Sequence, residues 1–202
     1  MKKTSKALLL TLCAVLLVAA SVMGTMAYLT STDEVVNTFT VGKVAITLDE
    51  AKVDADGVAV TPAERVKANT YHLLPGHTYA KDPTVHVAAD SENSWIFVKV
   101  ENGIAGYETT VAGETIADQI TANGWAPLTG VTGVYYKEYT SNAAATDLNV
   151  FGTFTVADDA NAKDGWTDIS TDTTKVTVTA YAVQKDGFDT AIAAWNATFG
   201  KN

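Results

Sequence analysis

The chain has 202 residues, in which 23 Asp and Glu outnumber 14 Lys and Arg, giving a formal net charge of −9. A charge this negative opposes binding to nucleic acid and to anionic lipid, so we expect neither as a partner. The length suits one domain with its own core. The only cysteine, Cys13, lies in an apolar N-terminal segment. The rest of the chain therefore has no disulfides and must rely on core packing, metal ions or self-association.

The first 27 residues have the three parts of a secretory signal peptide. A tip with three lysines precedes an almost entirely apolar run over residues 7–22, and Thr25-Met26-Ala27 supplies the small residues of a cleavage site. We predict a helical signal peptide over residues 1–27, cleaved between Ala27 and Tyr28. An uncleaved membrane anchor is the alternative, because the apolar run is nearly long enough to span a bilayer. Cleavage removes three of the 14 basic residues, which leaves 11 against 23 acidic ones, a net charge of −12.

Residues 36–41 and 44–48 alternate polar and apolar side chains, which predicts a strand over each. Cleavage frees the segment over residues 28–39, which is a candidate donor strand for an open sheet edge of another copy. Pairing within its own domain is the alternative. The candidate residues of the donor strand are Thr30, Val35, Val36, Thr38 and Phe39.

The remaining sequence alternates short β-branched and aromatic runs with turn-forming residues, a pattern typical of an all-β domain. Short helices are predicted over residues 113–123 and 187–199. Asn102-Gly103 suits a tight hairpin. Further strands are predicted over residues 84–87, 94–101, 134–139, 148–156 and 175–184. We expect one domain over residues 28–202, an all-β, jelly-roll-like two-sheet β-sandwich of eight or nine strands with one or two short helices.

The sequence shows no catalytic signature. A Gly-x-Ser-x-Gly nucleophile motif, a phosphate-binding loop and a His-Glu-x-x-His zinc motif are all missing. Three histidines, His72, His77 and His86, lie close together in the sequence and are weak candidate zinc ligands, against the alternative of surface or turn histidines. We assign no catalytic and no cofactor-binding residue.

Two acidic loops are weak candidates for calcium. Asp54-Ala55-Asp56-Gly57 resembles part of a calcium-binding loop, and four polar residues, Asp158, Asp159, Asn161 and Asp164, follow later in the chain. Turn-forming Asp and Asn in a solvated loop are the favoured explanation of both segments, because such turns are more common than bound calcium. Four tryptophans raise the alternative of a carbohydrate or peptide groove, but their wide spacing favours core packing. They are Trp95, Trp125, Trp166 and Trp195.

The N-terminal segment also resembles a known family. Residues 24–33, GTMAYLTSTD, are followed by Asn37-Thr38-Phe39-Thr40-Val41-Gly42-Lys43-Val44 and Ile46-Thr47-Leu48, and together they resemble the TasA/camelysin family. Shorter segments over residues 74–76, 81–85, 97–100, 180–184 and 187–188 look like segments common in that family. Its members are secreted proteins of Gram-positive bacteria with a SipW-dependent type of signal peptide.

The resemblance implies a jelly-roll-like β-sandwich that a dedicated signal peptidase of the SipW type processes. TasA-like members assemble into extracellular fibres of the biofilm matrix, in which the N-terminal strand of one subunit completes the sheet of its neighbour. Camelysin-like members are described as surface metalloproteases. We therefore expect a non-enzymatic matrix or cell-surface structural protein, whose partners are other copies of itself and other matrix components. A metalloprotease and a monomeric binding or adhesin module are the alternatives.

Overall fold

The computed structural model describes residues 5–6, 8, 10–18, 42–168 and 174–200. The chain divides into two units, Met1–Val41 and Gly42–Asn202. In the first unit, the described residues of the predicted signal peptide are helical. Among the described residues, no helix is long and apolar enough to cross a membrane. The predicted cleavage site at Ala27 and Tyr28 and the candidate donor strand lie outside the described residues.

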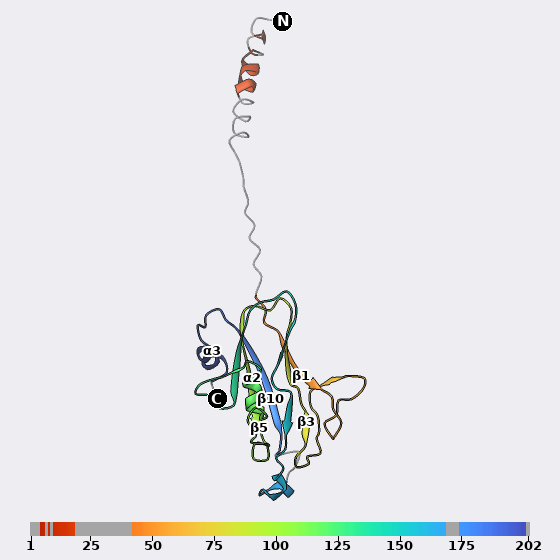
Figure 1. The fold of residues 1–202 in the computed structure, drawn as a ribbon. Coiled ribbons are helices and arrows are strands. Elements are labelled where there is room, and N and C mark those ends of the chain that lie inside the picture. The colour runs from red at the N-terminus through yellow and green to blue at the C-terminus, as the bar shows by residue number, and fades with distance from the viewer. Residues whose placement is uncertain (1–4, 7, 9, 19–41, 169–173, 201–202) are drawn as a thin grey trace. The chain divides into compact units, whose positions relative to one another are not determined.

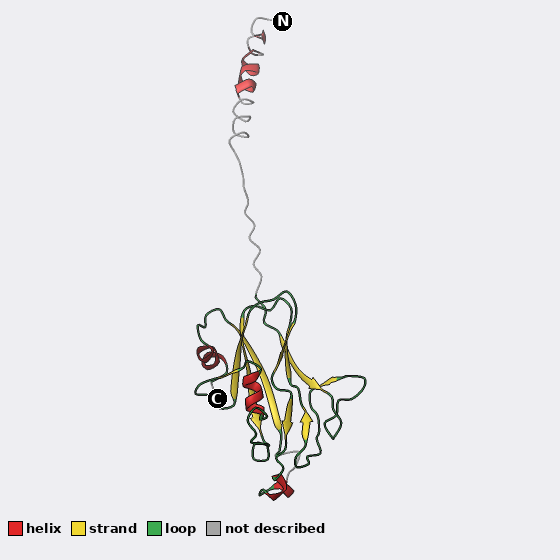
Figure 2. Ribbon diagram, viewed as in Figure 1, coloured by secondary structure: helices red, strands yellow, loops and turns green. Residues whose placement is uncertain are grey.

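The second unit consists of antiparallel β-sheets, as Figures 1 and 2 show. The first sheet contains, in spatial order, β2 (Arg65–Val66), β1 (Ile46–Ala51), β4 (Thr84–Val87) and β8 (Thr146–Asn149). The second sheet contains β10 (Val176–Gln184), β5 (Ser94–Asn102), β7 (Val134–Tyr139) and β6 (Ala126–Pro127). A small third sheet pairs β3 (Thr78–Ala80) with β9 (Thr153–Thr155). The expected all-β, sandwich-like fold is confirmed, whereas a jelly-roll connectivity stays a prediction.

One core fills the space between the two larger sheets. Val85 and Val87 of β4 and Ile96 and Val98 of β5 are completely buried in it. Burial of such side chains is the main source of stability of a domain without disulfides. The largest aromatic side chains of this core are Tyr79, Trp125, Phe151 and Phe154.

A second apolar cluster covers the other face of β5. The helix α3 (Ala191–Thr198) packs there, and its Trp195 contacts Phe97 and Tyr181, with ring centroids 5.3 and 5.4 Å apart. The second α-helix, α2 (Ile116–Ala122), begins at the cap residue Thr115, whose side chain accepts a hydrogen bond from the Asp118 amide. Short 3₁₀ turns form η1 (Ala160–Ala162) and η2 (Trp166–Asp168). Both predicted α-helices are therefore present, each shorter than expected.

Two local predictions are wrong. The pair Asn102-Gly103 ends β5 but makes no hairpin, because the neighbours of β5 are β7 and β10 and the chain turns instead toward α2. The predicted strand over residues 148–156 is two strands, β8 and β9, which belong to different sheets. Val150 and Phe151 stand between them and are completely buried, so core packing of these two side chains breaks the strand.

Three of the four tryptophans are core residues, as predicted. Trp95, Trp125 and Trp195 are buried, and the indole N–H of Trp125 donates to the Asn149 carbonyl oxygen over 2.8 Å. Trp166 is partly buried and packs against the main core from η2. None of the four therefore forms an exposed aromatic platform of the kind that binds carbohydrate.

Candidate functional site

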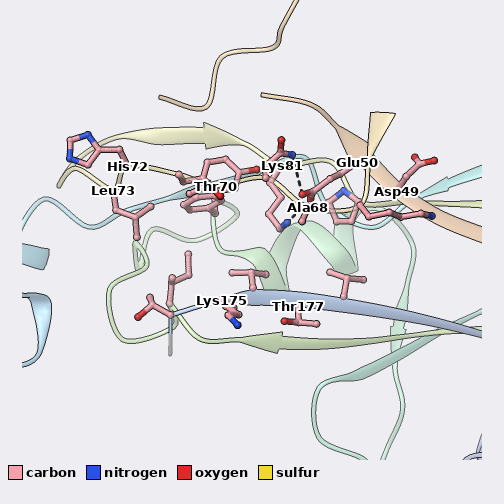
Figure 3. Close-up of a pocket in the computed structure, with 18 of the residues that line it drawn as sticks. Asp49, Glu50, Ala68, Thr70, His72, Leu73, Lys81, Lys175 and Thr177 are labelled. Atoms are coloured by element: carbon pink, nitrogen blue, oxygen red, sulfur yellow. Dashed lines mark hydrogen bonds and ion pairs between the residues drawn. The ribbon is translucent and has the colours of Figure 1, made fainter. Parts of the chain in front are cut away.

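A cavity of about 810 Å³ lies at the edge of the sandwich where β10 and β1 approach each other. One wall is β10 with the residues just before it, and the opposite wall is β1 with residues 67–73. Figure 3 shows this arrangement, with Lys175 and Thr177 across the cavity from Thr70 and Leu73. The larger apolar side chains of its lining are Leu48, Tyr71, Leu73, Ile104, Phe154, Trp166, Val176 and Val178.

The cavity lies beside an open strand edge. Within the described residues, β10 pairs only with β5, from Val176 opposite Asn102 to Gln184 opposite Ser94. The Gly103 amide donates to the Lys175 carbonyl oxygen, and the Lys185 amide donates to the Asn93 carbonyl oxygen, each over 2.7 Å.

These two bonds show which residues of β10 direct their backbone N–H and C=O groups toward β5. Hydrogen-bonded pairs alternate along an antiparallel ladder, so the odd-numbered residues of β10 bond to β5. The N–H and C=O groups of Val176, Val178, Ala180 and Ala182 consequently point away from it. An edge of this kind is able to pair with a further strand.

Three polar side chains meet in the wall of the cavity. The Oε2 atom of Glu50 is 2.5 Å from Lys81 Nζ, and its Oε1 atom accepts a hydrogen bond from Asn69 Nδ2 over 3.0 Å. The Glu50 and Lys81 side chains are only 5% and 11% exposed. Figure 3 shows Glu50 and Lys81 side by side in this wall.

The carboxamide of Asn69 is held by further bonds. Its Oδ1 accepts from the Val53 amide over 3.0 Å, and its Nδ2 also donates to the Ala51 carbonyl oxygen over 2.8 Å. The Tyr71 hydroxyl lies nearby and donates to the Ala80 carbonyl oxygen. Burial raises the pKa of the Tyr71 hydroxyl, and the negative charge of Glu50 raises this pKa further. The site is thus a closely bonded polar cluster in a largely apolar wall.

A second charged network lies on the outer face of the first sheet. His86 contacts Asp49 through Nε2 over 2.8 Å and Asp147 through Nδ1 over 2.6 Å. The Arg65 guanidinium binds Asp49 and also Asp82, whose Oδ2 is 3.0 Å from Arg65 Nη1. These residues belong to or adjoin four strands, so the network ties together β1, β2, β4 and β8.

The three histidines predicted as weak zinc ligands are not brought together. His86 is bound by the two aspartates just described, whereas His72 lines the cavity and His77 follows a turn. In the part of the chain that the structure describes, no group of three His, Cys, Asp or Glu side chains is placed to hold a metal ion. Separate strands and turns position the three histidines, which is why their closeness in the sequence did not translate into a cluster.

The first candidate calcium loop is a hydrogen-bonded turn. Asp54 Oδ1 accepts from the Asp56 and Val58 amides, and Gly57 adopts a φ of +78°. The carboxylate therefore stabilises the turn itself, which is the alternative that turn-forming residues suggested. In the second loop, Asp159 lies 3.6 Å from Lys163 in an exposed ion pair.

The sequence interpretation missed Glu50, Asn69 and Lys81. One signal was available for Glu50. Ile46, Leu48 and Glu50 alternate along β1, so the acidic residue stands on the strand's apolar face. An acid in that position predicts a buried partner, but nothing in the sequence identifies Lys81 or Asn69 as that partner.

A scan of the chain against protein-family models finds no match, and comparisons with curated proteins and with solved structures find none either.

Proposed function

We propose that the protein is a secreted structural subunit of a cell-surface or biofilm-matrix fibre, and that its copies join by strand addition. The observation that carries this proposal is the open edge of β10 beside the cavity. The even-numbered residues of β10, from Val176 to Gln184, turn their backbone groups toward this edge, and Val176 and Val178 also line the cavity. An added strand at this position gains main-chain hydrogen bonds and buries apolar side chains at the same time.

The proposed added strand is the N-terminal segment of a second copy, residues 28–39. It contains three threonines, two valines and two aromatic residues, and it has no proline or glycine. Such a segment adopts extended backbone readily and keeps all its N–H donors. Signal-peptide cleavage after Ala27 frees its end, so export and the ability to assemble are linked in this proposal. The resemblance of residues 24–48 to TasA/camelysin proteins supports the same role.

The test is assembly of the mature chain, beginning at Tyr28, against a truncated chain that lacks residues 28–39. We expect filaments of the mature protein by electron microscopy and none of the truncated protein, with an unchanged far-ultraviolet circular dichroism spectrum of the folded part. Adding the missing segment as a synthetic peptide is expected to inhibit growth of mature filaments, because it occupies the open edge without extending the chain of subunits.

Two outcomes overturn the proposal. Filaments of equal yield from the truncated protein show that residues 28–39 are not the added strand. A mature protein that light scattering finds monomeric at every concentration points to a binding or adhesin module, in which this segment pairs within its own domain.

A further inference from the structure

We propose that Lys81 and Asn69 form an intramolecular isopeptide bond, with Glu50 as the proton-transferring residue. The three side chains share one hydrogen-bonded cluster in the wall of the cavity. A primary amine and a carboxamide condense to an amide when a base accepts the amine's proton and an acid protonates the departing nitrogen. The cluster contains each of these parts.

Glu50 is placed to act on both reacting groups. Its two carboxylate oxygens contact the Lys81 amine over 2.5 Å and the Asn69 amide nitrogen over 3.0 Å. With Glu50 only 5% exposed, the pair of charges is shielded from water. In the proposed reaction, Glu50 first accepts one proton from Lys81. The transfer leaves an unprotonated amine, the nucleophilic form of lysine.

The carbonyl group of Asn69 is prepared for attack. The Val53 amide donates to Asn69 Oδ1 over 3.0 Å, so a donor already faces the oxygen on which negative charge develops. Asn69 Cγ is bonded directly to the Nδ2 atom that one oxygen of Glu50 holds, and the other oxygen of the same carboxylate holds Lys81 Nζ, so one side chain brings the two reactants into the same cluster. Holding the reactants together in this way replaces an intermolecular encounter with an intramolecular step.

The atoms balance without any oxidant or further reactant. Nζ attacks Cγ and forms the new C–N bond, while the carbonyl electrons move to Oδ1. Protonated Glu50 then gives its proton to Nδ2, the Cγ–Nδ2 bond breaks, and ammonia leaves as the carbonyl re-forms. Glu50 removes the second proton from Nζ and passes it to ammonia, which departs through the cavity as ammonium. The product is a secondary amide that links Lys81 to Asn69.

Glu108 is a second buried carboxylate, and its partners give it only a structural role. It accepts a hydrogen bond from Asn102 Nδ2 over 2.8 Å and another from the Ile116 amide over 2.6 Å. Both partners are neutral donors, and neither is a primary amine. The Glu50 cluster differs because it adds the nucleophile to the acid and the carboxamide. A bond there would close residues 69–81 into a ring, in a unit whose described part contains no cysteine.

The test is the mass of the purified, folded full-length chain, with its N-terminus read from the terminal peptide. We expect a mass about 17 Da below that of the sequence, the loss of one ammonia. Trypsin is expected to leave Lys81 uncut, so that residues 68–99 appear as one peptide. Chymotrypsin, which cuts after Tyr71 and Tyr79, should convert the ring into a branched peptide that joins Asn69 to Lys81.

Three variants and two controls distinguish ammonia loss through this bond from ammonia loss by other reactions. Lys81→Arg, Asn69→Ala and Glu50→Gln should each restore the full mass. Lys52→Arg, in the exposed Lys52–Glu64 pair, and Asn102→Ala should keep the loss. A loss that persists in Lys81→Arg indicates a succinimide at an asparagine and overturns the proposal. A wild-type chain with the full mass and a trypsin-sensitive Lys81 also overturns it, and this result does not depend on whether any variant folds.

Discussion

His86 on β4 and Asp49 on β1 are joined across the first sheet by a contact of 2.8 Å between Nε2 and Oδ1. The hydrogen bond with Asp49, followed by the one with Asp147, raises the pKa of His86 above its ordinary value of 6.5, although burial opposes this. For Asp49, burial acts to raise the pKa, but hydrogen bonds from Arg65 and His86 outweigh it and hold the pKa below 3.8. Each group therefore favours the charged form of the other.

The stability of the sheet should consequently depend on pH in two ranges. The contribution of His86 is fully present below pH 6.5 and is lost as the pH rises through its raised folded pKa. The contribution of Asp49 is present above pH 3.8 and is lost as the pH falls through its lowered folded pKa. We expect His86→Gln to lower the free energy of unfolding at pH 6 by about 1 kcal/mol or less, because the pair is partly exposed. The difference from wild type should shrink toward pH 9.

Urea unfolding at several pH values measures this effect. His72→Gln is the matched control, since His72 is exposed and lies outside the network. An equal change in both variants, or a difference that does not vary with pH, contradicts the assignment to His86.

Removal of the Trp195 side chain should uncover the outer face of the second sheet. Trp195 is 7% exposed and contacts Phe97, Tyr181 and Phe199. We expect Trp195→Ala to cost about 3–5 kcal/mol in the free energy of unfolding, from the lost burial and the cavity that remains. The neighbouring Asn196 is exposed, so Asn196→Ala should change this energy by no more than about 0.5 kcal/mol.

Loss of the Glu108 carboxylate should destabilise the start of α2. Its removal leaves the Ile116 amide and the Asn102 side chain without their acceptor, and both contacts are at least partly buried. We expect Glu108→Ala to cost roughly 2–3 kcal/mol by chemical denaturation, because unsatisfied buried donors are expensive. Glu114→Ala is the control on the exposed loop before α2. A cost of similar size in both variants would falsify this role of Glu108.

Proline at Ala180 should hinder assembly and spare the fold. The N–H of Ala180 points to the open edge of β10, where proline removes a donor for an added strand without breaking the ladder with β5. Thr179 lies in a hydrogen-bonded pair with Lys99, so Thr179→Pro is expected to cost about 3 kcal/mol. Electron microscopy and thermal unfolding of the two variants separate the effects. Normal filaments from Ala180→Pro place the added strand at a different edge.

The strands that were predicted well are those whose position depends only on their own residue pattern. Residues 84–87 and 134–139 match β4 and β7 residue for residue, because β-branched and aromatic runs bounded by turn residues specify a strand by themselves. The division of residues 148–156 between two sheets was not predicted, since it depends on which core space Val150 and Phe151 fill.

The residues of the candidate site were harder still to predict from the sequence. The three histidines drew attention because they are close in sequence, yet the fold separates them. No sequence signal connected Glu50 with Asn69 and Lys81, because 19 and 31 residues separate Glu50 from these partners. Only the packing of β1 against the segments before and after β3 brings the three together. Which polar groups share a buried site is a property of long-range contacts.

The sequence alone determined the alternation that makes this an all-β chain, the leader-like N-terminus, and the lack of cysteine beyond residue 13. These are local properties, because side-chain period and composition act on neighbouring residues. Tertiary structure decided that β10 lies at an open edge, that a cavity adjoins it, and that one carboxylate contacts both an amine and a carboxamide. Those features arise when distant segments pair and exclude water, and no single segment carries them.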